Sequence, residues 1–408
     1  MTDPILIAGA GIGGLGVALA LARQGIACRI IERAPEIREV GAGIQLGPNG
    51  FRAFERLGVD EAMDAISFRP RSVRLIDSVD GVELSRQTLG ALFEARFHYP
   101  YRVAYRADVQ KALLAAVQAR AGLVSISVGD GVREIVQEDG SVKVTLDSGA
   151  LVSGPALIGA DGLWSVARGH VLRPEPPRTS GHIAYRAVLA VDAVPATLLT
   201  DDVQVWIGPG HHLVCYKLRG GAIFNIIAIF HSDRAVNGWD TEGDRTELRR
   251  NFAQACAPVR GLIEQIDHGR MWALSDRDPE PGWSRGRVVL LGDAAHPMLP
   301  YLAQGACMAI EDGVTLADRL AAAPDDPQSA FRAYEEARFA RTASVQLAAR
   351  ETGAINHASG AERERRNAAL LTRRSDDYEA IAWLFGGDGP RPAAAAGDEI
   401  GIFGRRSA

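Results

Sequence analysis

The chain has 408 residues, of which 47% are hydrophobic and 23% are charged, and its formal net charge is −5. This composition is typical of a globular enzyme, and the length predicts a large domain that is interrupted by a smaller one. No lysine-rich or arginine-rich block is present, which excludes a polyanion-binding face, so we expect no nucleic acid partner.

The cysteines and the apolar runs limit the cellular context. Four cysteines without C-x-x-C spacing predict neither a metal site nor a disulfide framework and fit a reducing cytoplasm; they are Cys28, Cys215, Cys256 and Cys307. The longest apolar runs fall short of the ~18 residues that a membrane span needs. The first residues lack the charged segment of a signal peptide. We therefore expect a cytoplasmic protein with no metal and no membrane segment.

The N-terminal region predicts a β–α–β unit. An apolar run at residues 5–8 leads into a glycine loop, an alanine- and leucine-rich helix and a second apolar run at 27–31. The loop, Gly9-Ala10-Gly11-Ile12-Gly13-Gly14, satisfies G-x-G-x-x-G, and Glu32 ends the second strand. These glycines let the backbone approach a pyrophosphate at the helix N-terminus, and the Glu32 carboxylate accepts hydrogen bonds from a ribose. The pattern predicts a dinucleotide site and leaves FAD and NAD as alternatives.

Further elements follow in chain order. Residues 106–120 place apolar side chains on one helical face, and residues 123–159 alternate like the strands of a β-meander. Residues 183–230 predict an inserted sheet of hairpins, with a tight turn at Gly220-Gly221. A buried strand at 288–291 precedes a second glycine-containing turn and helical sequence from about Gly305. After residue 385, glycine, proline and alanine predict a frayed tail.

Two longer motifs identify the cofactor by resemblance. Residues 159–168 (Gly-Ala-Asp-Gly-Leu-Trp-Ser-Val-Ala-Arg) and residues 292–297 (Gly-Asp-Ala-Ala-His-Pro) resemble the Asp-Gly and Gly-Asp motifs of the class A flavin-dependent aromatic hydroxylases. That family includes 3-hydroxybenzoate, salicylate and 4-hydroxybenzoate hydroxylases, and the resemblance covers nearly the whole chain. It implies that Asp161 lies beside the cofactor pyrophosphate and serves nicotinamide binding. It also implies that Asp293, a pure acceptor, binds a ribityl hydroxyl of the flavin chain.

The same resemblance implies further cofactor contacts. Arg106 begins a helix where the family places an arginine that reaches the FAD phosphates, and a surface ion pair is the alternative for this cation. The loop at residues 41–49, which includes Gln45, resembles the segment that borders the isoalloxazine. The N–H groups near Gly305 and Ala306 would stabilise negative charge on the reduced ring. Arg33 and Pro300 complete the predicted cofactor set.

His212 and Tyr216 are the predicted catalytic and substrate-binding pair. They lie on an alternating segment, so their side chains project to one face and His211 projects to the other. A His-x-x-x-Tyr pair followed by Leu-Arg-Gly-Gly resembles that of the 3-hydroxybenzoate hydroxylases, in which the histidine takes the phenol proton. A base with a near-neutral pKa suits that task, because a phenolate ring reacts faster with electrophilic oxygen. A structural core pair is the alternative. The histidines at 98, 170, 231 and 268 are interpreted as structural or surface residues.

Pro300 departs from the 3-hydroxybenzoate pattern, which carries glutamine before Tyr-Leu, and matches the salicylate-type hydroxylases instead. We place Pro300 in the predicted substrate set as well. The segment at residues 378–385 resembles the endings of both groups, so it does not separate them.

The predicted fold is an α/β, Rossmann-like FAD-binding domain of the 4-hydroxybenzoate hydroxylase type with an inserted β-sheet substrate domain and C-terminal helices. The predicted limits are 1–75, 100–180 and 270–330 for the FAD-binding domain and 76–99 and 181–269 for the substrate domain. The helical region is 331–385 and the tail is 386–408.

The predicted function is that of an FAD-dependent, NAD(P)H-consuming monooxygenase that hydroxylates a 3-hydroxybenzoate- or salicylate-like acid through a flavin hydroperoxide. FAD is bound noncovalently, O2 and a small aromatic acid are the partners, and the protein is a monomer or a homodimer. A 6-hydroxynicotinate-type substrate and an idle flavoprotein remain alternatives. A halogenase is disfavoured because no Trp-x-Trp-x-Ile occurs, and an NAD-linked dehydrogenase leaves the second and third motifs unexplained.

Overall fold

A mostly parallel six-stranded sheet forms one half of the molecule. The computed structural model describes residues 3–37, 42–233, 241–266, 270–387 and 389–392. The strand order is β19-β20-β12-β1-β2-β8, and only the edge strand β19 is antiparallel. The strands are β1 (Ile5–Ala8), β2 (Cys28–Glu32), β8 (Val124–Val128), β12 (Leu157–Gly159), β19 (Ser284–Arg285) and β20 (Val288–Leu290). The predicted β–α–β unit and the predicted strand at 288–291 are confirmed, with limits that differ by one residue.

One helix packs against this sheet, and two further helices pack against that helix. The first is α1 (Ile12–Arg23), and the other two are α5 (Arg106–Gln118) and α9 (Gly305–Ala322). Every residue of β1 is buried, and ten of the twelve residues of α1 are buried. Continuous apolar runs of this kind are expected where a parallel sheet is covered on both faces. The helices predicted near residues 106 and 305 are confirmed.

The predicted meander at residues 123–159 is only partly correct. Its central strands β9 (Val132–Glu138), β10 (Ser141–Leu146) and β11 (Leu151–Gly154) form a separate antiparallel sheet. The first and last strands of the segment, β8 and β12, instead pair in parallel with β2 and β1. These pairings join residues far apart in sequence, and local alternation carries no information about them.

An eight-stranded sheet forms the other half, with the order β17-β18-β13-β16-β15-β14-β5-β6. Its strands are β5 (Ser72–Asp77), β6 (Glu83–Thr88), β13 (Arg178–Ala190), β14 (Val203–Gly208), β15 (His211–Leu218), β16 (Ile223–His231), β17 (Thr241–Glu242) and β18 (Arg270–Asp276). The hairpin between β15 and β16 turns at residues 219–221, as predicted. The sheet begins a few residues before the predicted limits of 76 and 181 and continues past 269, and the domain limits themselves stay a prediction.

The two faces of the eight-stranded sheet pack against different helices. Helices α7 (Arg245–Asn251) and α8 (Ala257–Glu264) cover the outer face through a cluster that includes Phe252 and Leu262. The inner face packs against the C-terminal helices through a cluster that includes Tyr216 and Ile229. The chain positions that share the inner face therefore point toward the rest of the molecule.

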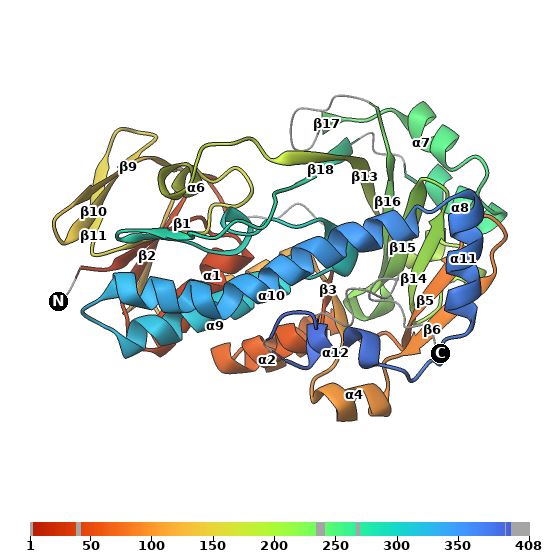
Figure 1. Cartoon of the computed structure of the whole chain (residues 1–408), viewed down its shortest axis with the longest axis horizontal. Coiled ribbons are helices and arrows are strands. Elements are labelled where there is room, and N and C mark those ends of the chain that lie inside the picture. The colour runs from red at the N-terminus through yellow and green to blue at the C-terminus, as the bar shows by residue number, and fades with distance from the viewer. Residues whose placement is uncertain (1–2, 38–41, 234–240, 267–269, 388, 393–408) are drawn as a thin grey trace.

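The long helix α10 (Pro327–Asn356) connects the two halves, as Figure 1 shows. It starts beside α9 and ends beside β15, and it is followed by α11 (Gly360–Leu371) and α12 (Glu379–Phe385). The ion pair between Arg363 and Asp77, at 2.8 Å, joins α11 to β5. Most of the predicted tail, residues 393–408, lies outside the described residues.

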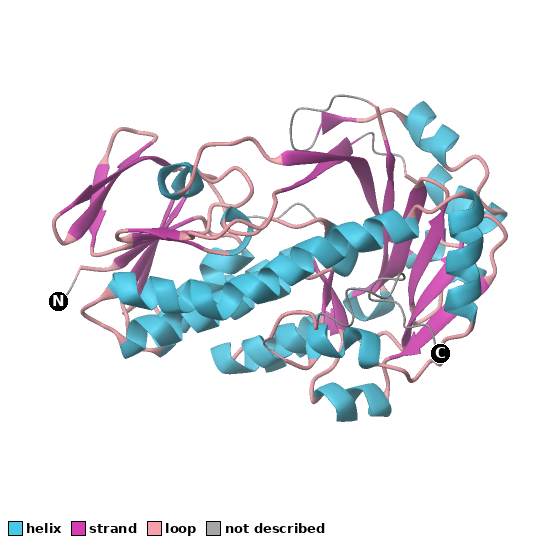
Figure 2. Cartoon of the chain, viewed as in Figure 1, coloured by secondary structure: helices cyan, strands magenta, loops and turns pink. Residues whose placement is uncertain are grey.

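A third group of elements consists of three short helices and a three-stranded sheet of order β3-β7-β4, and the short helices lie mostly below the long helices in the view of Figure 2. The helices are α2 (Pro48–Leu57), α3 (Asp60–Ile66) and α4 (Ala91–Phe97), and the strands are β3 (Gly43–Leu46), β4 (Ser67–Phe68) and β7 (Arg102–Tyr105). Within the described part of the chain, no helix combines the length and the apolar character needed to cross a membrane.

Candidate active site

A cavity lies where the carboxyl ends of the parallel strands meet the inner face of the eight-stranded sheet. Gly11, Ala160 and Leu291 follow the carboxyl ends of β1, β12 and β20, and all three line the cavity. The opposite wall comes from β13, β15, β16 and β18. Ligands of open α/β sheets bind at this edge, because the loops and helix N-termini converge there.

The glycine loop after β1 depends on close backbone contacts. Gly9 has φ +98°, and a Cβ atom on it would lie 2.6 Å from the carbonyl oxygen of Ala160. A Cβ atom on Gly14 would lie 2.0 Å from the carbonyl oxygen of Gly9, so only glycine fits at the start of α1. Gly11 has no atom within 4 Å of its Cβ position, which leaves its backbone open to the cavity. Two glycines thus serve packing, and Gly11 serves access for a ligand.

The Glu32 side chain holds the glycine loop by binding a backbone N–H group of that loop. Its carboxylate accepts hydrogen bonds from the N–H of Ala10 at 2.6 Å and the N–H of Ala34 at 2.8 Å. Each carboxylate oxygen keeps a further lone pair, so the predicted ribose contact stays a prediction. The next residue, Arg33, is largely exposed and pairs with Asp147 at 3.3 Å, and it is not among the residues that line the cavity. The structure therefore gives the predicted cofactor role of Arg33 no support.

Asp161 fixes, through hydrogen bonds, the loop that lines the cavity. Its carboxylate accepts hydrogen bonds from the N–H groups of Val166 and Ala167, at 2.7 and 3.1 Å, and from the hydroxyl of Ser165. It thereby holds the start of α6 (Val166–Val171). Burial raises the pKa of this carboxyl, and the hydrogen bonds oppose that effect. Asp161 itself is not among the lining residues, although its neighbour Gly162 is, and its predicted role beside a pyrophosphate stays a prediction.

The Gly-Asp turn after β20 presents Asp293 to the cavity. Gly292 has φ +62°, and a 3-10 turn spans Gly292–Ala294. The N–H of Gly292 donates to the carboxylate of Asp312 on α9 at 3.2 Å, and the Nε2 atom of His296 lies 2.5 Å from the same carboxylate. Arg338 on α10 adds an ion pair with Asp312 at 2.7 Å. Asp312 therefore anchors the turn that carries Asp293.

Asp312 is charged although it is fully buried. Burial raises the pKa of its carboxyl, but His296 and Arg338 outweigh that effect and lower it to about 2. Its neighbour Glu311 pairs with Arg338 at 2.6 Å and with Arg341 at 2.9 Å. No motif indicated this buried network. In the sequence, only the adjacent acids at 311 and 312, in a helical segment that is otherwise largely apolar, could have indicated buried ion pairs.

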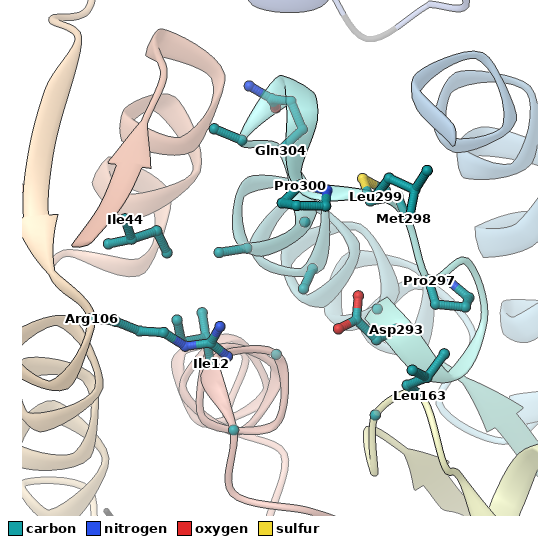
Figure 3. A pocket seen from close by; sticks show the side chains of 18 of the residues that line it. Ile12, Ile44, Arg106, Leu163, Asp293, Pro297, Met298, Leu299, Pro300 and Gln304 are labelled. Atoms are coloured by element: carbon teal, nitrogen blue, oxygen red, sulfur yellow. The ribbon is translucent and has the colours of Figure 1, made fainter. Parts of the chain in front are cut away.

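Several predicted cofactor residues lie together around the cavity. Arg106 enters it from the start of α5, and Figure 3 shows its side chain pointing toward the beginning of α1. The Asp293 carboxylate points into the same space. The first N–H groups of α9 are not capped by a side chain, which suits a negatively charged group. The predicted residues that line the cavity are Gly11, Gly13, Gln45, Arg106, Tyr216, Asp293, Pro300, Gly305 and Ala306.

The sheet wall of the cavity carries Tyr216 and Arg186. A Cβ atom on Gly43 would lie 2.5 Å from the Tyr216 hydroxyl, so β3 passes directly over this phenol. The N–H of Gly43 donates to the side-chain oxygen of Asn225 at 2.8 Å, which fixes β3 against the sheet. Arg186 is a lining residue that no motif indicated, although it is a cation among the mostly apolar residues in the second half of β13. Its guanidinium lies 5.1 Å from the ring centroid of Trp272.

His212 shares the inner face with Tyr216, as predicted, but it does not line the cavity. Its Nδ1 atom lies 2.6 Å from Nε2 of His357, and its ring centroid is 5.3 Å from that of Tyr301. Burial, followed by neighbouring histidines, lowers the pKa of His212 to about 3, so its imidazole is neutral. His211 points to the outer face, where its Nε2 atom lies 2.9 Å from the Ser78 hydroxyl. The predicted strand register is confirmed, the pKa of His212 lies below the near-neutral value expected of the base because the ring is buried, and the catalytic role stays a prediction.

Comparisons with known proteins agree with this geometry. The family model of an FAD binding domain matches residues 2–349. A 3-hydroxybenzoate 6-hydroxylase of Polaromonas naphthalenivorans (strain CJ2) is 43% identical over 94% of this chain and 96% of its own length. A 3-hydroxybenzoate 6-hydroxylase of Aquipseudomonas alcaligenes is 39% identical over 95% of this chain and 98% of its own. The chain belongs to the flavin-dependent aromatic hydroxylases.

A solved relative of these hydroxylases supports the cofactor as well. The structure of Klebsiella pneumoniae HpxO with FAD and uric acid has a TM-score of 0.83 and 28% identity, and the match covers 95% of this chain and 97% of that one. The present chain is an FAD-dependent monooxygenase that takes electrons from NADH or NADPH. Its residues fit FAD, because the loop needs glycine at 9 and 14, Gly11 is open to the cavity and Asp293 offers an acceptor there.

The described residues also bear on the sequence expectations about metal ions and cysteines. Within the described ranges, no group of three histidine, cysteine or acidic side chains is arranged to hold a metal ion. All four cysteines are free, and three of them are buried. Two residues for which the sequence gave expectations, Gly41 and His268, lie outside the described residues.

Proposed function

We propose that this monooxygenase hydroxylates a monocyclic phenolic acid of the 3-hydroxybenzoate or salicylate type. The proposal rests on one cavity whose two sides suit different ligands, the cofactor and a small aromatic acid. One side offers Gly11, Asp293 and the uncapped start of α9 to the cofactor, and the other offers Tyr216 and Arg186 to a small polar ring. The 3-hydroxybenzoate 6-hydroxylases that this chain resembles act on an acid of this class.

Arg186 is the proposed counter-charge for the substrate carboxylate. It is permanently cationic, and it lines the cavity beside Ile227 and Tyr216. A carboxylate leaves water readily only if a fixed cation replaces its hydration. The surrounding wall is largely apolar, with Ile227, Met298 and Leu299, and suits the faces of an aromatic ring.

Tyr216 is the proposed hydrogen-bond donor to the substrate. Burial raises the pKa of its hydroxyl above the usual range, while Arg186 opposes that effect, so the phenol stays protonated near neutral pH. A protonated hydroxyl in a buried wall orients an oxygen of the ring by donating to it. The residue therefore positions the substrate and does not remove its proton.

His212 is the proposed base. It lies on the same face as Tyr216 and four residues along the strand, which corresponds to roughly 13 Å between their Cα atoms. Its imidazole is neutral, so it has an unprotonated nitrogen to accept the phenol proton, although burial makes it a weaker base than the near-neutral histidine that the sequence predicts. Loss of that proton makes the ring electron-rich, and bound FAD, once reduced, would activate O2 as the electrophile that such a ring attacks.

Pro300 favours the salicylate type within this class. It lines the cavity and offers neither an N–H nor a side-chain amide to a ring substituent. A heteroaromatic acid is the second candidate, because a 6-hydroxynicotinate 3-monooxygenase of Bordetella bronchiseptica is 33% identical over 84% of this chain. A cytoplasmic location, inferred from the four free cysteines, and a monomeric or homodimeric state belong to the same proposal.

A substrate panel tests the proposal. The FAD-loaded protein is mixed with NADH and with 3-hydroxybenzoate, salicylate, 4-hydroxybenzoate or 6-hydroxynicotinate, and both NADH oxidation and hydroxylated product are measured. We expect slow oxidation without ligand and faster oxidation with one of the phenolic acids, with product formed in proportion. Equal rates with and without every ligand, and no product, identify an idle flavoprotein and refute the proposal.

A further inference from the structure

One residue of the cavity wall has a strained backbone. Ala303 lies in the left-handed region, with φ 52° and ψ 36°. Residues that carry a side chain rarely adopt this conformation, because the Cβ atom crowds the following carbonyl oxygen, whereas glycine adopts it freely. Ala303 follows the short 3-10 turn at Pro300–Leu302 and comes just before the start of α9, and it lines the cavity.

This strain differs in its place from the other cases in the molecule. Within the described ranges, the residues other than glycine that have a positive φ are His98, Arg219 and Ala303. His98 ends α4 and is exposed, and Arg219 lies in the turn between β15 and β16 with a side chain that is 49% exposed. Neither of these two residues lines the cavity. Ala303 therefore places a strained residue at a ligand site, where strain often serves function.

Contacts on both sides of Ala303 hold it in this conformation. The hydroxyl of Tyr301 lies 2.6 Å from the Nδ1 atom of His182 on β13. On the other side, the side-chain oxygen of Gln304 accepts a hydrogen bond from Asn49 on α2, at 2.8 Å. A strained residue persists where the surrounding structure fixes its neighbours. The loop is held at both ends, so it has little freedom to relax around Ala303.

Only a methyl group distinguishes alanine from glycine at this position. Glycine would form the same turn without strain, so the backbone conformation does not require alanine. In the chain, Ala303 lies between Pro300, in the proposed substrate wall, and Gly305, at the predicted contact with the reduced flavin ring, and all three residues line the cavity. The cavity has a volume of about 330 Å³. In a space of this size, one methyl group on the wall limits what fits beside the cofactor.

We propose that Ala303 is a specificity-determining residue, whose methyl group closes the cavity to phenolic acids that carry an additional methyl group on the ring edge facing this loop. This inference rests on the proposed function of the cavity. A closely packed wall accepts an extra carbon atom only if its own atoms move, and the anchored loop opposes such a movement. A hydrogen atom at that ring position fits against the wall, whereas a methyl group meets the Cβ atom of Ala303.

The size of the effect follows from the size of the group. One methyl or methylene group in an apolar pocket changes the discrimination between two ligands by roughly 10- to 200-fold. The wild-type protein should therefore bind the parent acid at least tenfold more tightly than the excluded methylated isomer. Replacement of Ala303 by glycine removes the methyl group and the strain together, so it should reduce this discrimination without lowering the melting temperature.

Ligand titrations of FAD-loaded wild type and Ala303→Gly test the proposal. 3-Hydroxybenzoate, salicylate and each of their ring-methylated isomers are added in turn, and Kd is measured from the flavin absorbance. We expect the Kd of at least one methylated isomer, divided by that of its parent acid, to be at least tenfold smaller in Ala303→Gly than in wild type. The Kd of the parent acids should stay close to the wild-type value, and the melting temperature should hold or rise.

His98→Gly is the matched control. It also places glycine at a left-handed position, but at a residue that does not line the cavity, so its Kd ratios should equal those of wild type. Unchanged ratios in Ala303→Gly for every methylated isomer would overturn the proposal. Weaker FAD binding as the sole effect of Ala303→Gly would also overturn it, because the methyl group would then contact the cofactor. A wild-type flavin spectrum that no phenolic acid perturbs would instead refute the proposed function and this inference with it.

Discussion

Replacement of Asp312 by asparagine tests whether the buried charge network holds the Gly-Asp turn. The asparagine side chain would keep an acceptor for the N–H of Gly292 but would lose the negative charge that faces Arg338 and His296. A carboxyl whose pKa falls from 3.8 to about 2 has its charged form stabilised by about 2 kcal/mol. Breaking a buried pair costs about 3–5 kcal/mol, and Arg338 keeps Glu311 as a partner. We therefore expect a loss of about 2–3 kcal/mol in the free energy of unfolding.

The assay is urea unfolding of the FAD-loaded protein, followed by circular dichroism and by flavin fluorescence. The depressed pKa means that the contribution of Asp312 is fully present above its unfolded value of about 4 and is lost as the pH falls through about 2. The difference between wild type and Asp312→Asn should therefore be constant from pH 8 to about pH 4 and should shrink below that. FAD should also bind more weakly, because the turn that carries Asp293 loses its anchor.

Asp318→Asn is the matched control on the same helix. Asp318 pairs with Arg56 at 2.6 Å near the surface, where an ion pair contributes less than about 1 kcal/mol. Equal unfolding free energies and equal FAD affinities for wild type, Asp312→Asn and Asp318→Asn would refute the reasoning. A loss of equal size in both variants would also contradict it, since burial distinguishes the two sites.

Three other changes probe the cavity. Asp293→Ala should weaken FAD binding by roughly 1.5–3 kcal/mol, because a ribityl hydroxyl loses a charged acceptor; an unchanged Kd in a fluorescence titration would contradict the assignment. Gly14→Ala should yield protein that retains little FAD, because the new Cβ meets the Gly9 carbonyl oxygen at 2.0 Å, whereas Gly90→Ala has open space and should bind normally. His212→Asn should keep ligand-stimulated flavin reduction but lower hydroxylation by roughly 100-fold or more and release hydrogen peroxide. If His211→Asn behaves in this way and His212→Asn does not, the base lies on the other face.

Features that depend on spacing along the chain could be predicted from the sequence. The glycines at 9 and 14 and the helix that follows them form a local structure, because a turn, a close contact and a helix start all involve neighbouring residues. The opposite directions of His211 and His212 follow from the two-residue period of a strand. The Gly-Asp turn at Gly292 was predicted for the same reason, since it is a short motif after a buried strand.

Features that depend on pairing between distant segments were decided only by the tertiary structure. The position of β8 beside β2, and not in the meander, follows from a parallel pairing that alternation along the chain does not encode. Arg186 enters the cavity wall because β13 pairs with both β16 and β18. Four histidines, at residues 182, 212, 231 and 357, come together because β13, β15, β16 and the end of α10 meet at one place, and no spacing in the chain relates them. Packing of the long helix α10 across both sheets brings His357 to His212, because burial of its apolar side chains fixes where it ends.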